Sequence, residues 1–425
     1  MNTIKPKERT AILDSLKAGV VPRIGLQHIQ VGRSKEITEL IRDFNDIKEG
    51  ASKIRFIIGE FGSGKSFFLT LAMGISHEYN FISTKIDVTT EKVLYSRDNK
   101  AQNLYSEIIK NLSTKIRPDG GALKIIIESW IEKKIGINKE VPIDKIESEL
   151  SYIRNFVSGY DFSTIVTKYY EGFITGDDRL MDNCIRWLSG EYQTKTDALH
   201  DLGVRSIITD ENYYDYIKLL SQFIKDAGYN GLQICIDELA VLARLNSQTR
   251  TRNYETILKF YNDCLQGQLS GIYYLFGGTP EFLRHPTKGL YSYGALKTRL
   301  SDNPFADSEC RDLSGPIIEL NNLTQEELFA VFCNIRNVFA YYDNSKFLID
   351  DSGITEFMKW IFNRLGAESF LSPREAIKNY VNLLSQIENY PQKTWKDFLF
   401  LSEPSNNSNQ SSDSDGITKL NNLKL

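Results

Sequence analysis

Short apolar runs and helical stripes alternate in the first hundred residues. Residues 54–58 and 81–88 are dominated by apolar side chains over a length typical of buried strands. Residues 5–20 and 34–49 instead place apolar side chains at helical spacing, and Ser34 is a candidate N-cap of the second helix. This alternation is typical of an α/β fold with a parallel sheet.

A long segment in the middle of the chain carries only the helical pattern. Between residues 101 and 228, apolar positions recur three and four residues apart, as at Leu104, Ile108 and Leu112. A crossover between parallel strands needs only about a dozen residues. The length of this segment therefore predicts a large helical insertion mounted on the sheet domain.

Strand patterns return after the insertion, and helices follow. We expect strands at 232–236, 271–279 and 316–320, and then helices at about 325–341, 352–365 and 372–387. The predicted domains are an N-terminal segment with the first part of the core (1–100), the helical insertion (101–228), the second part of the core (229–322), a helical lid (323–400) and a disordered polar tail (401–425).

One glycine-rich stretch joins the strand at 54–58 to the helix after it. Its residues are Gly59, Glu60, Phe61, Gly62, Ser63, Gly64, Lys65, Ser66 and Phe67. Glycines allow a tight turn whose backbone N–H groups face a polyphosphate, and the helix N-terminus favours the same anion. The order strand, loop, helix predicts an ATP-binding P-loop, with Lys65 on the β- and γ-phosphates and Ser66 on Mg²⁺. The alternative is an ordinary glycine-rich turn.

Two adjacent carboxylates end the strand at 232–236. In a Walker B pattern, Asp237 would hold Mg²⁺ through its water shell, and Glu238 would orient and polarise the attacking water. The alternative is that the two acids cap a helix at 239–245. Downstream of a P-loop, the pair favours hydrolysis over nucleotide binding alone.

Two polar residues are further candidates for the catalytic machinery. Thr279, after the strand at 271–279, would contact the γ-phosphate and the lytic water, unless it is only a turn residue before Pro280. Arg299 would reach the γ-phosphate of a neighbouring subunit as an arginine finger. Arg284 and Arg311 compete for that role, and a surface salt bridge is the plainer alternative.

Two segments predict contacts to the nucleotide from outside the P-loop. Val31 and Gly32 belong to a "VGR" turn similar to the adenine-side segment of AAA+ ATPases, although an ordinary loop explains it as well. Arg374 follows a serine cap, Ser372, and a proline at the start of the last helix. An arginine at this place in a helical lid resembles the nucleotide sensor of AAA+ proteins.

Composition excludes several classes of protein and leaves others open. The net charge of −4 over 425 residues gives no general attraction to nucleic acid, so any such contact needs a local patch. No apolar run approaches the length of a membrane span, and the first residues lack a signal-peptide core. The scattered cysteines and histidines indicate reduced thiols in a cytoplasmic protein and no metal beyond the Mg²⁺ of the nucleotide. The cysteines are Cys184, Cys235, Cys264, Cys310 and Cys333.

Several strings together resemble one family, the P-loop ATP-binding proteins of BREX-type bacterial phage-defence systems. They are GVVPR (19–23), VGR (31–33), IGEFGSGKSF (58–67), RPDGGAL (117–123), CIDEL (235–239), NYE (253–255), NDCLQG (262–267), FGGTPEF (276–282), GLYSY (289–293) and DLSGP (312–316). The resemblance implies an AAA+-like (ASCE) P-loop ATPase related to the initiator and STAND branches. It also implies other defence proteins as partners, among them a helicase. Leu239, Ala240 and Val241 after the acids depart from the expected polar pair.

Two classes of function follow from these patterns. The first is an ATP-hydrolysing switch or motor that forms nucleotide-dependent homo-oligomers through Arg299 and acts on DNA or a DNA-bound partner. The second is a nucleotide-gated scaffold with little turnover, or a signalling NTPase without nucleic-acid contact. Glu238 beside Asp237 favours the first.

Overall fold

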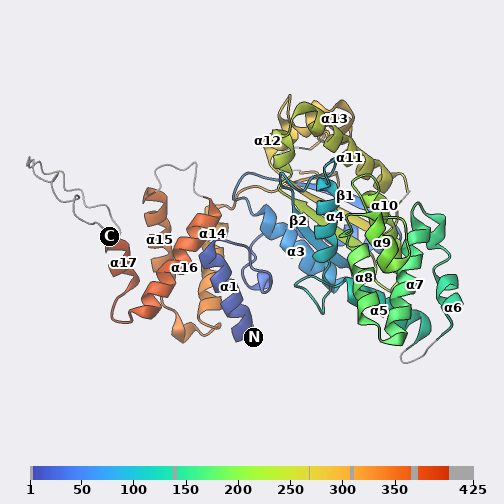
Figure 1. Cartoon of the computed structure of the whole chain (residues 1–425). Helices are drawn as coiled ribbons and strands as arrows, with labels where there is room; N and C mark the ends of the chain where they lie inside the picture. Colours follow the sequence, from blue (N-terminus) through green and yellow to red (C-terminus); the bar gives the residue numbers. More distant parts are fainter. Residues whose placement is uncertain (1–2, 137–140, 268, 307–310, 365–371, 402–425) are drawn as a thin grey trace, which may run out of the picture.

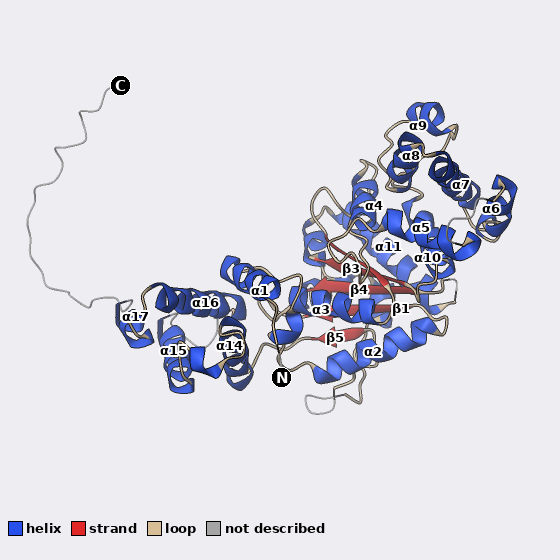
Figure 2. Ribbon diagram, turned by 90° about the horizontal axis from the view of Figure 1, so that it is seen from below, coloured by secondary structure: helices blue, strands red, loops and turns tan. Residues whose placement is uncertain are grey.

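The computed structural model contains a five-stranded parallel sheet with the strand order β2-β3-β4-β1-β5 (Figure 2). It describes residues 3–136, 141–267, 269–306, 311–364 and 372–401. The strands are β1 (Lys53–Ile58), β2 (Ile82–Asp87), β3 (Leu232–Asp237), β4 (Ile272–Gly278) and β5 (Ile317–Glu319). The expected α/β architecture with a parallel sheet is therefore confirmed, and each predicted strand is present.

Parallel pairing brings the carboxyl ends of all five strands to one edge of the sheet. In the register, Ile58 of β1 lies beside Gly278 of β4, and Asp237 of β3 lies beside Asp87 of β2. Strand β4 thus separates the strand before the P-loop from the strand that ends in the acids. Such an edge is where α/β folds bind ligands.

The two faces of the sheet bury different sets of side chains, which gives three layers. Ile57, Cys235 and Leu275 pack against one helical layer, while Phe56 and Phe276 point into the other. The first layer holds α2 (Ser34–Lys48) and α3 (Lys65–Glu78), and the second holds α4 (Lys100–Lys110), α10 (Tyr213–Asp226) and α11 (Ser247–Leu265).

Helix α2 begins differently from the prediction. Ser34 is its first helical residue, whereas the N-cap is Arg33, in the left-handed region with φ 64°. The Arg33 carbonyl accepts the first helical hydrogen bond, from Ile37 N–H at 2.9 Å. The prediction that Ser34 is the N-cap was therefore wrong, because the residue that precedes the helix is Arg33.

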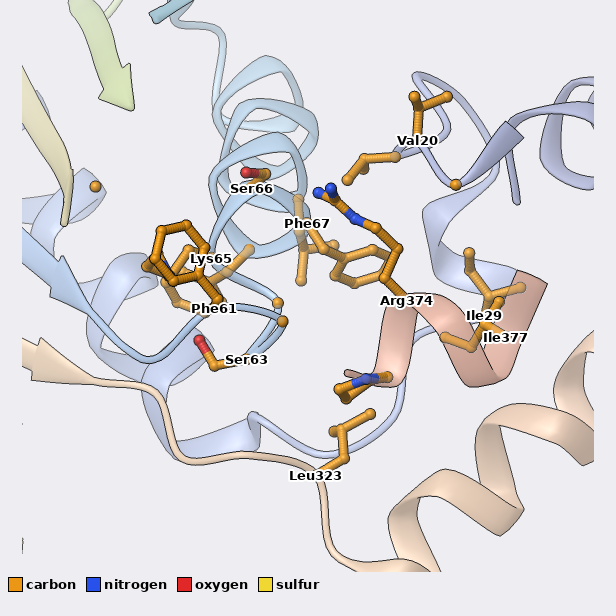
Figure 3. Close-up of a pocket in the computed structure, with 18 of the residues that line it drawn as sticks. Val20, Ile29, Phe61, Ser63, Lys65, Ser66, Phe67, Leu323, Arg374 and Ile377 are labelled. Atoms are coloured by element: carbon orange, nitrogen blue, oxygen red, sulfur yellow. The ribbon is translucent and has the colours of Figure 1, made fainter. Parts of the chain in front are cut away.

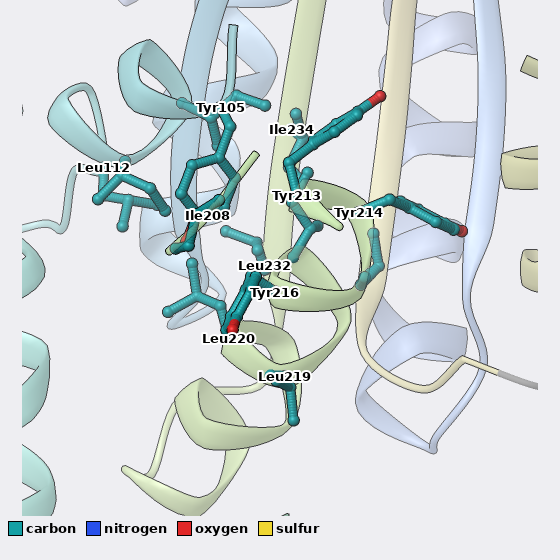
Figure 4. Close-up of a cluster of buried hydrophobic side chains, with 14 of the residues drawn as sticks. Tyr105, Leu112, Ile208, Tyr213, Tyr214, Tyr216, Leu219, Leu220, Leu232 and Ile234 are labelled. Atoms are coloured by element: carbon teal, nitrogen blue, oxygen red, sulfur yellow. The ribbon is translucent and has the colours of Figure 1, made fainter. Parts of the chain in front are cut away.

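The predicted insertion lies between β2 and β3 and shares its core with the sheet. Tyr216 and Leu220 of α10 pack beside Leu232 of β3 (Figure 4). The remaining helices of this segment lie at the side of the molecule away from the lid (Figure 1). They are α5 (Leu123–Ile135), α6 (Ile143–Glu149), η2 (Ile153–Asn155), α7 (Gly159–Thr175), α8 (Asp178–Leu188) and α9 (Lys195–Leu202).

Two predicted helical stretches take another form. Within the segment 101–228, the helical pattern breaks after α6 into the 3₁₀ turn η2. This turn packs so tightly on α7 that a Cβ at Gly159 would lie 1.9 Å from the Ile153 carbonyl oxygen. The stretch after the acids is also a 3₁₀ helix, η3 (Leu239–Arg244). The second half of the core adds α12 (Pro280–Arg284), η4 (Leu290–Ser292) and α13 (Gly294–Arg299).

The C-terminal helices and the first helix of the chain form a bundle around a second hydrophobic core, which also takes in Leu71 of α3 (Figure 1). Its members are α1 (Pro6–Ala18), η1 (Leu26–His28), α14 (Gln325–Phe339), η5 (Asn344–Lys346), α15 (Asp351–Arg364), α16 (Pro373–Asn389) and α17 (Trp395–Leu401). Arg9 of α1 donates to the Phe339 carbonyl at 2.9 Å and pairs with Glu388 at 3.6 Å. We call this bundle the lid.

Neither α17 nor the position of α1 was predicted. The domain limits proposed from the sequence stay predictions, and residues 402–425 of the proposed tail lie outside the described residues. In the described part of the chain, no helix has the combined length and apolar character that a membrane crossing requires.

Candidate functional site

A cleft of about 190 Å³ lies where the carboxyl edge of the sheet meets the lid (Figure 3). One end is polar and contains the β1–α3 turn and the end of β3. The other end is apolar and is lined by Leu16, Val20, Val21, Pro22, Ile29, Val31, Phe67, Leu71, Leu323, Val331, Ile335 and Ile377. The cleft therefore combines an anion-binding turn with an apolar recess.

Glycines shape the β1–α3 turn. Gly62 and Gly64 have φ of 85° and 89°, a region that L-residues with side chains rarely adopt. A Cβ at Gly59 would lie 2.4 Å from Ser63 Oγ, whereas a Cβ at Gly64 would have no neighbour within 4 Å. The turn is thus compact on its inner side and open toward the cleft, where the first N–H groups of α3 lack helical acceptors.

Lys65 closes this turn. Its Nζ donates to the carbonyl oxygens of Gly59 at 2.7 Å and Glu60 at 2.8 Å. Burial lowers the pKa of the Lys65 ammonium. Phe61 is 70% exposed and lies with its ring centroid 5.6 Å from the same Nζ. The ammonium is therefore placed inside the loop, where a phosphate could take over its hydrogen bonds.

Asp237 is buried, and both of its carboxylate oxygens accept hydrogen bonds. Ser66 Oγ donates to Oδ2 at 2.7 Å, and the Glu238 N–H donates to Oδ1 at 2.9 Å. Gly277 on the adjacent strand makes room for this carboxylate, because a Cβ there would lie 2.3 Å from Oδ1. The structure thus brings together Ser66 and Asp237, residues 171 positions apart in the chain.

The oxygen atoms at this point fit Mg²⁺. A serine hydroxyl beside a carboxylate supplies the hard oxygen donors that the ion prefers, with water and phosphates completing its shell. The described residues contain no group of three or more histidine, cysteine, aspartate or glutamate side chains able to hold a metal by themselves.

Glu238 stands at the mouth of the cleft in a strained backbone conformation, with φ 57°. Its side chain is exposed and makes no capping hydrogen bond to η3. The alternative in which the Glu238 side chain caps the following helix is therefore not what the structure shows. The neighbouring residues still desolvate its carboxyl group in part, which raises its pKa, and the negative charges of Asp237 and Asp87 add to this effect. The group is therefore a better proton acceptor than an ordinary glutamate.

The lid contributes Arg374 to the cleft. This residue follows Ser372, whose hydroxyl accepts the Glu375 N–H at 3.3 Å, which confirms the predicted cap. The Arg374 side chain is exposed and extends toward Val20 and the start of α3 (Figure 3). Its positive charge lowers the pKa values of both Lys65 and Glu238, so it faces the polar end of the cleft.

Thr279 and Arg299 occupy different positions relative to the cleft. Thr279 lines it, although its Oγ1 accepts the Phe282 N–H at 3.1 Å as the cap of α12. Arg299 is exposed on α13, outside the lining residues, and donates to Asn262 Oδ1 and to the Ala295 carbonyl, both at 3.0 Å.

The two competing arginines are held by carboxylates of the same chain. Arg284 pairs with Glu319 and with Asp302, the latter at 3.6 Å. Arg311 pairs with Glu36 at 3.1 Å.

The "VGR" turn lies next to the cleft and connects three elements. Val31 lines the apolar end, whereas Gly32 approaches the lid, since a Cβ there would lie 2.6 Å from Glu327 Oε1. The Arg33 guanidinium donates to the carbonyl oxygen of Ser63 at 3.2 Å and to that of Asn321. Arg33 thus links the P-loop to the segment that leads into α14.

Sequence reasoning missed two sets of residues around the cleft. The apolar recess depends on residues 19–22, which the resemblance flagged without a role, and on lid residues far away in the chain. Lys85 of β2 was also missed, although its Nζ lies 3.7 Å from Asp237 Oδ2. The alternation along β2 could have placed Lys85 and Asp87 on one face, but the pairing with β3 was needed to bring them to Asp237.

Comparison with protein families gives one match. The model for "BREX system ATP-binding protein BrxC/D" matches residues 4–402. No match to a curated protein or to a solved structure is found.

Proposed function

The chain belongs to the family of BREX system ATP-binding proteins BrxC/D, and from this premise we propose that it is an ATP-hydrolysing, AAA+-like subunit of an anti-phage defence system. The family supports ATP as the ligand and other defence proteins as partners. Hydrolysis and the residues that carry it out are our proposal.

One observation carries the proposal: four side chains expected from the two motifs meet at the polar end of a single cleft. Lys65 and Ser66 come from the turn after β1, and Asp237 and Glu238 come from the end of β3. The Ser66–Asp237 hydrogen bond of 2.7 Å joins the two motifs directly. A strand order that places β4 between β1 and β3 is also the order expected of an ASCE-type core.

In the proposed reaction, the triphosphate lies along the open side of the β1–α3 turn. Lys65 would exchange the carbonyl oxygens of Gly59 and Glu60 for phosphate oxygens, and Ser66 and Asp237 would hold Mg²⁺. Bound Mg²⁺ neutralises charge on the phosphates. Glu238 would orient a water molecule and accept its proton as the water oxygen attacks the γ-phosphorus, while the bond from the γ-phosphorus to the bridging oxygen breaks and ADP leaves. Thr279, at the end of the neighbouring strand, would contact that water.

The apolar recess is the proposed site for the base. It is built from the 19–22 segment, from the start of α3 and from the lid. Arg374 then reaches the phosphates from the lid side. A nucleotide in this position would touch the sheet domain and the lid at once, so its hydrolysis would change how they are held together.

We further propose that the subunit acts as a nucleotide-dependent homo-oligomer, with Arg299 as the arginine supplied to the next subunit. Arg299 is exposed and bonded only to uncharged groups among the described residues, in contrast to Arg284 and Arg311. The mass in solution, with and without a non-hydrolysable ATP analogue, checks this arrangement. A helicase and DNA remain the proposed partners.

Glu238→Gln tests the hydrolytic role. It keeps the size and polarity of the side chain but removes the proton acceptor, so phosphate release should fall by about 10²–10⁴-fold while ATP still binds. Phosphate release and calorimetric ATP binding are measured on the full chain, with Glu255→Gln on α11 as the matched control. Equal release by the parent and by Glu238→Gln would favour a nucleotide-gated scaffold instead.

A further inference from the structure

A second lysine, Lys85, lies beside the proposed metal site. It belongs to β2, and its Nζ donates to the Ser66 carbonyl at 3.2 Å and to Thr70 Oγ1 at 3.5 Å. The same Nζ is 3.7 Å from Asp237 Oδ2, the oxygen that accepts the Ser66 hydroxyl. Lys85 is therefore held by the beginning of α3 while it faces the carboxylate.

The surroundings of Lys85 are strongly acidic. Asp237 has a side chain only 3% exposed, and Asp87 adjoins it in the register of β2 and β3. Burial raises the pKa of both Asp87 and Glu238, and the negative charge of Asp237 adds to this effect in each case. Three carboxylates this close repel one another, and a buried carboxylate needs a cation or strong hydrogen bonds. The Lys85 ammonium supplies positive charge at the place where Mg²⁺ would also supply it.

Resting on the function proposed above, we infer that Lys85 is a positioning residue that acts as a built-in counter-cation of the Mg²⁺ site. It holds Asp237 toward Ser66 when no metal is bound. Because its contacts with Ser66 and Thr70 keep it in place, it then opposes the incoming ion by charge repulsion. Lys85 would thus set the concentration of Mg²⁺ that the nucleotide complex requires.

A plain structural ion pair is the competing explanation, and it makes a different prediction. A structural pair would affect the stability of the fold, whereas a counter-cation would also change the Mg²⁺ dependence of the nucleotide complex. Lys85→Met removes the charge at similar length, Lys85→Gln removes it but keeps an N–H donor, and Lys85→Arg keeps the charge. Lys53→Met is the matched control, since Lys53 pairs with Asp46 at 2.7 Å at the opposite end of β1.

The experiment titrates Mg²⁺ into the full chain with a non-hydrolysable ATP analogue and follows the thermal unfolding midpoint. We expect half-saturation at about tenfold lower Mg²⁺ in Lys85→Met and Lys85→Gln, because a repulsive unit charge is lost within a few ångströms of the ion. Lys85→Arg and Lys53→Met should match the parent. Should Lys85→Met fail to fold, Lys85→Gln gives the same comparison.

The outcomes separate this inference from the proposed function. Equal or higher half-saturation in the neutral variants overturns the role of Lys85. A parent chain that binds the analogue with Mg²⁺ but releases no phosphate from ATP overturns hydrolysis, yet the titration still decides the role of Lys85. A parent chain that binds no nucleotide at any Mg²⁺ concentration overturns both.

Discussion

The cleft joins two regions that the chain builds in different ways. On the sheet side, Asp237 and Glu238 end a fully buried strand whose register with its neighbours fixes their position. On the lid side, Arg374 lies at the start of α16, a helix that packs into the second hydrophobic core. The comparison teaches that the groups proposed for chemistry are held by the sheet, while the group proposed to sense nucleotide belongs to the lid.

The lid core is built around a cluster of aromatic rings. Phe332 is fully buried, and its ring centroid lies 4.6 Å from that of Tyr380 and 5.4 Å from that of Phe357. Ile12 of α1 is buried in the same core. If the two regions are separate, disturbing this cluster should leave the sheet intact.

Phe332→Ala should have the largest effect, and it tests whether the lid unfolds separately from the sheet domain. Removing the ring leaves a cavity and should cost about 3–5 kcal/mol of stability. Amide exchange of the full chain should then speed up in α1, α14, α15 and α16, while β1, β3 and β4 stay protected. Phe276→Ala is the matched change in the sheet core and should speed up amide exchange in the strands. Equal loss of protection everywhere in Phe332→Ala would show one cooperative unit.

Arg374→Ala should have an intermediate effect. A charged hydrogen bond from the lid to phosphate would be lost, so ATP should bind about tenfold more weakly. The control is Lys378→Ala, one turn further along α16, whose side chain also lies near Gly19. Calorimetric titration measures both variants, and equal affinities in Arg374→Ala and Lys378→Ala would remove Arg374 from the site.

The pH dependence of turnover should show the smallest effect. Glu238 must be ionised to accept a proton, so phosphate release should fall as the pH drops through its pKa, which is raised above the usual 4.5. The positive charge of Arg374 lowers this pKa. In Arg374→Ala the acid limb should therefore move to higher pH, by less than about one unit because the arginine is exposed. If the acid limb of the pH profile does not move, the charge of Arg374 does not influence the pKa of the Glu238 carboxyl group.

Local features of the site could be predicted from the sequence. The P-loop depends on glycines, a lysine and a serine within one short stretch, and the paired acids follow directly on an apolar strand. The cap at Ser372 was also found, because a capping residue, a proline and an acid lie next to one another. Each of these residue patterns is typical of one local backbone geometry, so the geometry can be predicted from neighbouring residues alone.

Features that depend on distant pairing could not be predicted. Nothing near α1 shows that it packs on α16, and nothing near Lys85 shows that β3 lies beside it. The start of α2 was misplaced because a left-handed Arg33 is fixed by bonds to Ser63 and Asn321, which are remote in the chain. Tertiary contacts overrode the local preference in each case.

The placement of α1 has a mechanical consequence. Because this helix and η1 are part of the lid core, the backbone passes between the lid and the sheet domain twice, once through residues 30–33 and once through residues 320–324. Two connecting segments restrict how the lid can move relative to the sheet domain. The least restricted movement is rotation about the line that joins these two segments. Under the proposed hydrolysis, the lid would then respond to each ATP turnover by a rotation about one axis.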